Sequence, residues 1–419
     1  MKKFALYFAL GVVSCGFAFS QTYNVLFNFD GYDGAAPSYL VFDGAGNLYG
    51  VGGGGSNECG AAFGCGTIFE LSPSNGSWTE KVLYYFCSSG NCVDGVFPNG
   101  GIVLDKAGNI YGTTSTGGAL GGGVVFEISP NGIETVLYQF CANSPQDCPG
   151  GSTPRAGLVM DSSGNLYGTT FYGGNCYIGN VGCGVVFELS PPSVQGGAWA
   201  ETILYNFCSV NANCPDGAYP AYGNTLTFDR FGNLYGMTGY YGSNKGNCCG
   251  TIYKLSPQGN TWVYTVLYAP SDPAGLEGPL SLDGSGTIYG VFNGNSVYQY
   301  GGAFRLNAEG HPSIFGFSNW SDGSLPETGV VLDTQNHALY GTTQYGGIDY
   351  GTVFKLAGRP PLETVLHNFC SETGCADGQY PYALIEDGLG NLFGTTINGG
   401  TGTCSLFTNG CGLVFEITP

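Results

Sequence analysis

The stretch DSSGNLYGTTFYGG, residues 161–174, sets the pattern for the whole chain of 419 residues. Its centre, Gly-Asn-Leu-Tyr-Gly, recurs along the chain in recognisable form. The seven copies lie at residues 46–50, 108–112, 164–168, 232–236, 286–290, 338–341 and 390–394. They repeat about every 57 residues, which is long for a solenoid coil and close to the length of a propeller blade with enlarged loops.

Each period contains four short segments with the composition of β-strands. In the third copy these are residues 157–161, 165–170, 184–190 and 201–207, all rich in Val, Ile, Leu, Phe and Tyr. Asp161 can cap the turn between the first two segments, and Gly164 supplies the left-handed residue that the turn needs. No long helical periodicity interrupts the pattern. Each period therefore predicts one four-stranded antiparallel meander.

The two ends of the chain complete the pattern. Residues 23–29 resemble an unpartnered fourth strand, and residues 412–419 an unpartnered third strand. Joined together they complete a last meander, which closes a ring and leaves no open sheet edge. We therefore predict an all-β fold over residues 21–419, a single seven-bladed β-propeller of four-stranded antiparallel blades in which the N-terminal strand joins the last blade.

The full repeat, DG..P..GLV.D..GNLYGTT..GG....GVVFELSP.G..ETVLYNF, resembles the GloVer tandem-repeat family of exported bacterial proteins. The resemblance covers essentially all of the chain after its first 20 residues. It implies export and a choice of surface anchors, but no catalytic residue. Anchored members carry a sorting tail, whereas Pro419 ends the final strand here, so surface attachment would depend on lipidation of Cys15.

The first 20 residues have the features of a secretory signal. Lys2 and Lys3 precede an apolar run, and small residues precede Gln21. Residues 12–15, Val-Val-Ser-Cys, resemble a lipobox, so lipidation at Cys15 is the alternative. No other stretch is apolar for long enough to span a bilayer. We expect a secreted, extracellular bacterial protein, or else a lipoprotein anchored at Cys15.

The composition is strongly acidic. The chain has 11 Lys and Arg against 30 Asp and Glu, a formal net charge of −19. Phosphate backbones would be repelled, so we expect no nucleic-acid partner, and solubility is a sufficient reason for the charge. The content of hydrophobic residues, 43%, is ample for a buried core. We expect a monomer.

Apart from Cys15, the 17 cysteines form neighbouring pairs along the chain. With an export signal and an even count, local disulfides are the expected outcome. Metal binding is not expected, because His311, His337 and His367 lie far from most of these cysteines. Cys248 and Cys249 are adjacent in the sequence, so they could form a strained ring with each other or pair with two separate partners. The pairs are Cys59/Cys65, Cys87/Cys92, Cys141/Cys148, Cys176/Cys183, Cys208/Cys214, Cys370/Cys375, Cys404/Cys411 and Cys248/Cys249.

The cysteine pairs fall in the connections from fourth to first strands and from second to third strands. These connections emerge on one face of a propeller, and long stapled loops on a rigid ring are a usual place for binding. The motif DG..P lies just before the first strand, so we expect its aspartates around the mouth of the central channel, where they could hold calcium or sugar hydroxyls. The alternative is that each aspartate caps its own turn. The aspartates are Asp94, Asp216, Asp322 and Asp377, with an altered first copy at Asp33.

Aromatic side chains on the same face form the second candidate set, since flat rings can stack on sugars. The alternative is that they pack over the loops or between blades. By contrast, we expect the Leu-Tyr of each repeat to lie in the core between blades, and Trp78, Trp199 and Trp262 to lie at the opposite face. The candidate rings are Tyr172, Tyr177, Tyr219, Tyr240, Tyr241, Trp320, Tyr345 and Tyr380.

Enzyme motifs are largely absent from the sequence. It contains no G-x-S-x-G elbow, no phosphate-binding loop and no H-E-x-x-H. We therefore expect a secreted, non-enzymatic binding or structural module that recognises a glycan or a cell-surface protein, with no cofactor unless calcium. The alternative is a carbohydrate-active enzyme, a glycoside hydrolase or lyase, that uses carboxylates at the channel mouth.

Overall fold

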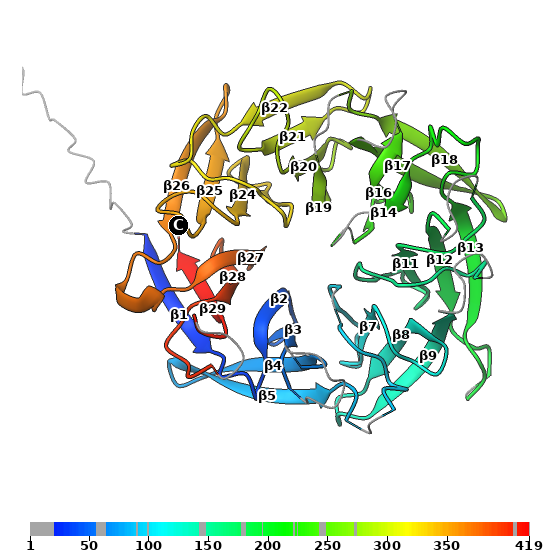
Figure 1. The fold of residues 1–419 in the computed structure, drawn as a ribbon, viewed down its shortest axis with the longest axis horizontal. Coiled ribbons are helices and arrows are strands. Elements are labelled where there is room, and N and C mark those ends of the chain that lie inside the picture. Colours follow the sequence, from blue (N-terminus) through cyan, green and yellow to red (C-terminus); the bar gives the residue numbers. More distant parts are fainter. Residues whose placement is uncertain are drawn as a thin grey trace, which may run out of the picture.

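The fold is a ring of antiparallel sheets. The computed structural model describes residues 21–418, apart from residues 56–63, 89–90, 99, 142–147, 177–181, 195, 221–222, 224, 243–248, 272–274 and 405–408. In this described part, seven sheets stand around a central axis (Figure 1) and no α-helix is found. The predicted seven-bladed β-propeller is confirmed. The predicted signal, residues 1–20 with Cys15, lies outside the described residues.

Blades 1 to 3 follow one another along the chain, each with its first strand innermost and its last strand outermost (Figure 1). Blade 1 contains β2 (Ala35–Phe42), β3 (Leu48–Gly53), β4 (Thr67–Ser74) and β5 (Ser77–Tyr85). Blade 2 contains β6 (Val103–Leu104), β7 (Ile110–Thr114), β8 (Gly121–Ile128) and β9 (Glu134–Cys141). Blade 3 contains β10 (Val159–Met160), β11 (Leu166–Thr170), β12 (Val185–Ser190) and β13 (Ala200–Asn206).

Blades 4 to 6 continue the ring, and in blade 4 the inner strand is split into two segments that both pair with the second strand. Blade 4 contains β14 (Ala218–Pro220), β15 (Thr227–Phe228), β16 (Leu234–Gly242), β17 (Cys249–Gln258) and β18 (Thr261–Tyr268). Blade 5 contains β19 (Leu276–Leu282), β20 (Ile288–Phe292), β21 (Gly302–Leu306) and β22 (Pro312–Gly316). Blade 6 contains β23 (Val330–Asp333), β24 (Ala338–Thr343), β25 (Thr352–Ala357) and β26 (Leu362–Asn368).

Blade 7 joins the two ends of the chain, as predicted. Its outermost strand, β1, pairs antiparallel with β29, and Val25 lies opposite Phe415. Phe415 is fully buried and packs against Tyr23 of β1, with 5.5 Å between ring centroids. Closure therefore rests on core packing as well as on backbone hydrogen bonds. After the short 3-10 turn η2 (Thr373–Cys375), the blade contains β27 (Gln379–Glu386), β28 (Leu392–Asn398), β29 (Leu413–Thr418) and β1 (Thr22–Asn28).

The repeated motif forms the hairpin turn between the first two strands of a blade. Asp161 Oδ1 accepts hydrogen bonds from the backbone N–H groups of Ser163 and Asn165. Its Oδ2 accepts one from the amide of Asn165 and one from the hydroxyl of Tyr167, at 3.1 Å. Gly164 has a φ of 84°, which glycine adopts without strain. The motif is thus a self-contained turn in which aspartate, asparagine and tyrosine satisfy one another.

The core lies between neighbouring blades, as expected for the Leu-Tyr pairs. Leu166 of blade 3 is fully buried in one cluster with Tyr111 of blade 2, while Tyr167 packs into the next cluster with Leu234 of blade 4. Each repeat therefore supplies one side chain to the interface behind it and one to the interface ahead. Burying such side chains is worth roughly 1.5–3 kcal/mol each, so blades stabilise one another around the ring.

Candidate functional site

Two faces follow from the topology. The connections from one blade to the next, with the loops between second and third strands, make up the loop face. The hairpin turns between first and second strands, and between third and fourth strands, make up the turn face. Both candidate sets from the sequence belong to loop-face connections or to the strand ends that adjoin them.

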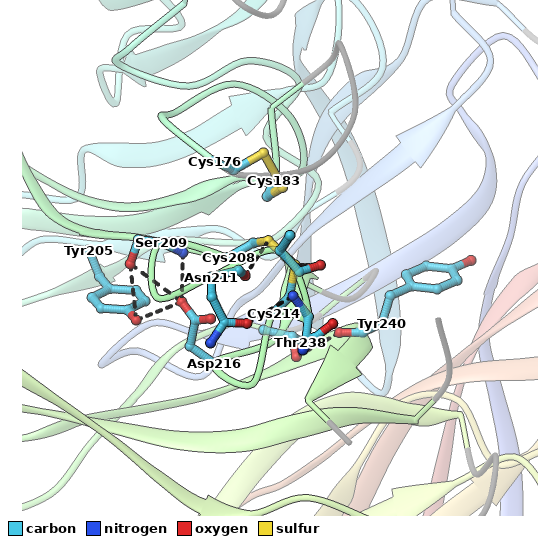
Figure 2. Close-up of a disulfide and its surroundings, with 12 residues drawn as sticks. Cys176, Cys183, Tyr205, Cys208, Ser209, Asn211, Cys214, Asp216, Thr238 and Tyr240 are labelled. Carbon is cyan, nitrogen blue, oxygen red and sulfur yellow. Dashed lines mark hydrogen bonds between the residues drawn. A yellow bond between two sulfur atoms is a disulfide. The ribbon is translucent and has the colours of Figure 1, made fainter. Parts of the chain in front are cut away.

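Asp216 shows what the aspartate of the DG motif does on the loop face (Figure 2). Its Oδ2 accepts hydrogen bonds from the hydroxyl of Tyr205 at 2.8 Å and from the backbone N–H of Ser209 at 2.9 Å. The disulfide Cys208–Cys214 closes the same loop. The carboxylate and the disulfide together hold the connection from β13 to β14 in place.

The same arrangement recurs before blades 2 and 7. Asp94 Oδ2 accepts from the Tyr84 hydroxyl and from the backbone N–H of Cys87, beside the disulfide Cys87–Cys92. Asp377 Oδ2 lies 3.2 Å from His367 Nε2 and accepts from Ser371. Burial alone would raise the pKa of Asp377, but the hydrogen bonds from His367 and Ser371 outweigh it and lower the pKa to about 2.

The expected position of these aspartates at the channel mouth is wrong. Tyr84, Tyr205 and His367 belong to the outermost strands β5, β13 and β26, so the carboxylates that contact them lie far out on the blades. The physical reason is that the connection leaves an outer strand and turns back against it before it runs inward. Asp94, Asp216 and Asp377 are 6%, 3% and 0% exposed, which fits the capping alternative. Asp322 accepts from Ser318 of its own loop.

Six of the eight predicted disulfides lie within the described residues and are formed. The partners expected for Cys65 and Cys249, namely Cys59 and Cys248, lie outside the described residues. Cys176, Cys183, Cys208 and Cys214 belong to a single packed cluster, so two disulfides from neighbouring loops support each other (Figure 2). The six are Cys87–Cys92, Cys141–Cys148, Cys176–Cys183, Cys208–Cys214, Cys370–Cys375 and Cys404–Cys411.

Two of the predicted aromatic residues, Tyr172 and Tyr219, come together. Tyr172 is in a loop of blade 3 and Tyr219 is in β14 of blade 4; their ring centroids lie 6.1 Å apart. Phe171 contacts both rings, at 4.7 and 5.4 Å, and Arg155 places its guanidinium 4.2 Å from the Phe171 centroid. Tyr240 extends the row 5.8 Å from Tyr219 and is 49% exposed. We call these five residues the Tyr219 cluster.

A second group of rings lies on blades 5 to 7, in their loops and at the start of β27. Tyr380 packs against Tyr345 and Tyr350, with centroids 5.4 and 5.8 Å apart. Trp320 is 41% exposed, contacts Tyr300 at 6.2 Å and donates its indole N–H to Asp349 at 2.7 Å. The second group is therefore split into two smaller contacts. Tyr177 lies outside the described residues.

Four residues that the sequence reasoning missed surround the axis. The hydroxyls of Tyr39 in β2 and Tyr382 in β27 lie 3.3 Å apart, and the Tyr39 hydroxyl reaches the segment entering blade 4, where a Cβ on Gly223 would lie 2.2 Å from it. Burial first, then Tyr382 and the carboxylates of Glu277 and Glu327, raise the pKa of Tyr39 well above its usual value. Burial, followed by Glu327, raises the pKa of Glu277 to about 7. Two carboxyls and two phenols thus share one site at the axis.

A positional signal in the sequence could have found most of these residues. Glu327 and Tyr382 directly follow the proline of the DG..P motif, as Arg155 follows Pro154. Tyr382 lies within the inner strand β27, and Glu327 lies just before the inner strand β23, so this position belongs to the part of each blade that is nearest the axis. Glu277 stands at the same place in blade 5, where the motif itself is absent. Among the described residues, no group of three or more His, Cys, Asp or Glu is arranged to hold a metal ion.

Solved structures similar to this chain are also propeller-type proteins with little sequence identity. A catalytically inactive virginiamycin B lyase from Staphylococcus aureus, solved with quinupristin, has a TM-score of 0.58 and 13% identity, over 96% of this chain and 100% of that chain. A streptogramin B lyase has a TM-score of 0.56 and 13% identity, over 95% and 97%. PorZ of the type-IX secretion system of Porphyromonas gingivalis has a TM-score of 0.51 and 14% identity, over 94% and 47%. At such identities the likeness shows the fold alone.

Sequence comparison identifies the family. No curated protein matches the chain. In the structure, the described residues contain no helix that is long and apolar enough to cross a membrane. A family model, the Gloeobacter/Verrucomicrobia repeat, matches residues 11–246 and 153–347. Together these matches cover most of the chain, including six of its seven hairpin motifs. The chain belongs to the Gloeobacter/Verrucomicrobia repeat family, as its repeat motif predicted.

Proposed function

We propose that this chain is an exported, non-enzymatic binding module whose loop face holds a glycan on the Tyr219 cluster. One observation carries the proposal: rings from two successive blades, Tyr172 and Tyr219, converge beside Arg155 and leave the ring of Tyr240 half exposed. Aromatic rings offer a large apolar face together with a polar edge, which suits the two kinds of surface on a sugar. The disulfides are typical of proteins that work outside the reducing cytosol.

The supporting framework is rigid where a binding surface needs it. Two disulfides and the buried carboxylate of Asp216 hold the loops under the cluster, so little conformational entropy is lost on binding. Because Asp94, Asp216 and Asp377 are buried, we assign them to loop support and leave them out of the contact surface. Trp320 and Tyr380 offer further contacts for a long glycan or for a cell-surface protein.

A glycan array probed with the chain from residue 21 onward, with and without calcium, tests this function. The strongest glycan is then titrated against Tyr240→Ala, and we expect affinity to fall about tenfold, close to 1.4 kcal/mol. The matched control is Val263→Ala, which removes another exposed apolar side chain of blade 4, 42% exposed, and should leave affinity unchanged. Absence of any bound glycan, or equal losses in both variants, would contradict the proposal.

The residues around the axis favour a second candidate, a glycoside hydrolase or lyase. A carboxyl with a pKa near 7, such as Glu277, can act as a general acid or base at neutral pH. Glu327 and the phenols of Tyr39 and Tyr382 lie close to it. If the chain cleaves any polysaccharide in a panel, Glu277→Gln should lower kcat by about a hundredfold or more, whereas Tyr240→Ala should mainly raise KM.

A further inference from the structure

The turn face carries a row of grooves between blades, and three of them are filled by tryptophan. Each indole lies at or just before the start of the fourth strand of its blade and packs on the aromatic ring of the preceding blade's hairpin motif. Trp78 lies 6.2 Å from Phe393, Trp199 lies 6.3 Å from Tyr111, and Trp262 lies 6.1 Å from Tyr167, measured between ring centroids. The molecule itself therefore shows that such a groove accepts a flat bicyclic ring.

The groove between blades 5 and 6 has no tryptophan. In blade 1, the ladder that pairs Leu71 with Glu80 also pairs Pro73 with Trp78. In blade 6 the same ladder pairs Leu356 with Glu363 and Ala357 with Leu362, so the next position outward, where tryptophan stands in blade 1, is Pro361. A pyrrolidine ring is much smaller than an indole, and the groove stays open.

An open cavity of about 910 Å³ occupies this place, within the size range of small-molecule sites. Its walls include Tyr289 of the blade 5 hairpin and the leucines Leu332, Leu339 and Leu356 of blade 6. These are the counterparts of the residues that surround tryptophan in the filled grooves. Ile314, on the blade 5 wall, is 41% exposed. Apolar surface is thus left uncovered where three sister grooves bury it.

The charge at the open groove differs from that at the filled ones. Arg305 pairs with Tyr289 across the strands, whereas the same position holds Glu127, Glu188 and Glu416 beside the filled grooves. Arg359 lines the same cavity. In a chain with 11 Lys and Arg against 30 Asp and Glu, two arginines at one apolar cavity are a marked local excess of positive charge.

Within the described residues, no ion pair joins Arg305 or Arg359 to an acid. Asp283 also lines the cavity and offsets part of this positive charge, while its two oxygens accept hydrogen bonds from Ser285 and Thr287 of its own turn and from Tyr289. The pKa of Tyr289 is raised by burial and by Asp283, while Arg305 and Arg359 act in the opposite direction, so both guanidinium groups lie within electrostatic range of the Tyr289 hydroxyl.

We propose that the cavity between blades 5 and 6 binds a small planar aromatic carboxylate, whose ring takes the place of the missing indole and whose carboxylate pairs with Arg305 and Arg359. The ring would pack between Tyr289 and the leucines, and the acid would lie at the outer edge, where guanidinium groups bind carboxylates in two-pronged fashion. The site lies on the turn face and does not depend on the function proposed for the loop face.

Three probes that share one ring system test the proposal by calorimetry on the chain from residue 21 onward. Indole-3-propionate should bind saturably, indole should bind at least tenfold more weakly, and tryptamine should bind more weakly still. Arg305→Gln and Arg359→Gln should each lower the affinity for indole-3-propionate at least fivefold. Arg230→Gln, on the hairpin turn of blade 4, should leave this affinity unchanged. Equal affinity for the three probes, no binding at millimolar concentration, or no effect of either arginine variant would overturn the proposal.

Two further variants exchange the open and filled grooves. Pro361→Trp supplies the missing indole and should abolish binding of indole-3-propionate; binding that persists would place the ligand elsewhere and overturn the site. Trp262→Gly opens a sister groove beside Glu188, which should take indole but not indole-3-propionate. If the opened sister groove binds the acid as well as the natural cavity does, the role of the arginines is refuted.

Discussion

The two faces of the ring are built on different rules. On the turn face, Asp43, Asp105, Asp161 and Asp229 repeat the same set of hydrogen bonds to backbone, asparagine and tyrosine. On the loop face, connections differ from blade to blade in length, disulfides and aromatic residues, and the Tyr219 cluster has no close copy elsewhere in the described chain. Repetition therefore encodes the architecture, while departures from it create sites.

The acids of the hairpin turns and those of the outer strands also differ in their titration. On the turn face, burial alone would raise the pKa of Asp105, but hydrogen bonds from Asn109 and Ala107 outweigh it and lower the pKa. On the outer strands β9 and β26, burial and neighbouring aspartates raise the pKa of Glu134 to about 7 and that of Glu363 to about 8. At neutral pH the ionised form is therefore favoured for the turn aspartates and disfavoured for the outer-strand glutamates.

The largest effect is expected from the core that supports both faces. Phe415→Ala removes a fully buried ring at the seam between β1 and β29 and should lower the free energy of unfolding by about 3–5 kcal/mol. Val25→Ala, on the partner strand but 37% exposed, should cost below about 1 kcal/mol. Chemical denaturation measures both. If both variants lose a similarly small free energy of unfolding, packing between β1 and β29 contributes little to the stability of the protein.

Removing a turn-face aspartate should cost less. Asp161→Ala leaves the backbone N–H groups of Ser163 and Asn165 and the hydroxyl of Tyr167 without their acceptor, and we expect a loss of about 1–3 kcal/mol by denaturation. Asp161→Asn keeps one acceptor oxygen and should recover part of that loss. If alanine is as stable as the native chain, the repeated turn is not an architectural element.

A loop-face disulfide should have a smaller and more local effect. Replacing Cys208 and Cys214 together by serine reopens a short loop, which costs about 2 kcal/mol in the chain-entropy model. Amide exchange should quicken in the connection from β13 to β14 and stay unchanged in the hairpin of blade 4, around Asp229. Faster exchange throughout the blade would show that the disulfide supports the fold and not only the loop.

The smallest effect concerns pH. Since the folded pKa values of Glu134 and Glu363, about 7 and about 8, exceed the unfolded value near 4.3, their stabilising contribution is full at low pH. It is lost as pH rises through 7 to 8. We expect the urea midpoint to fall between pH 6 and pH 9, and the Glu134→Gln, Glu363→Gln double variant to flatten that fall. A midpoint that rises over this range would contradict the assignment.

Sequence reasoning succeeded where the determinants were local and repeated. The turn at Asp161 and the pairing of residues 23–29 with 412–419 followed from patterns that recur in every blade. It placed Asp94, Asp216 and Asp377 too close to the central axis. Closeness in sequence to an inner strand does not tell whether the loop first folds back against the preceding outer strand. It missed Glu277 and Glu327 because the repeat motif does not specify the residue that points to the axis.

Amide hydrogen exchange with the array-selected glycan bound tests the central claim, that binding belongs to the loop face. We predict protection in the loop that holds Phe171 and Tyr172 and in the connection that holds Tyr219, with the hairpins at Asp105, Asp161 and Asp229 unchanged. Protection confined to those hairpins, or to the inner strands alone, would contradict the account.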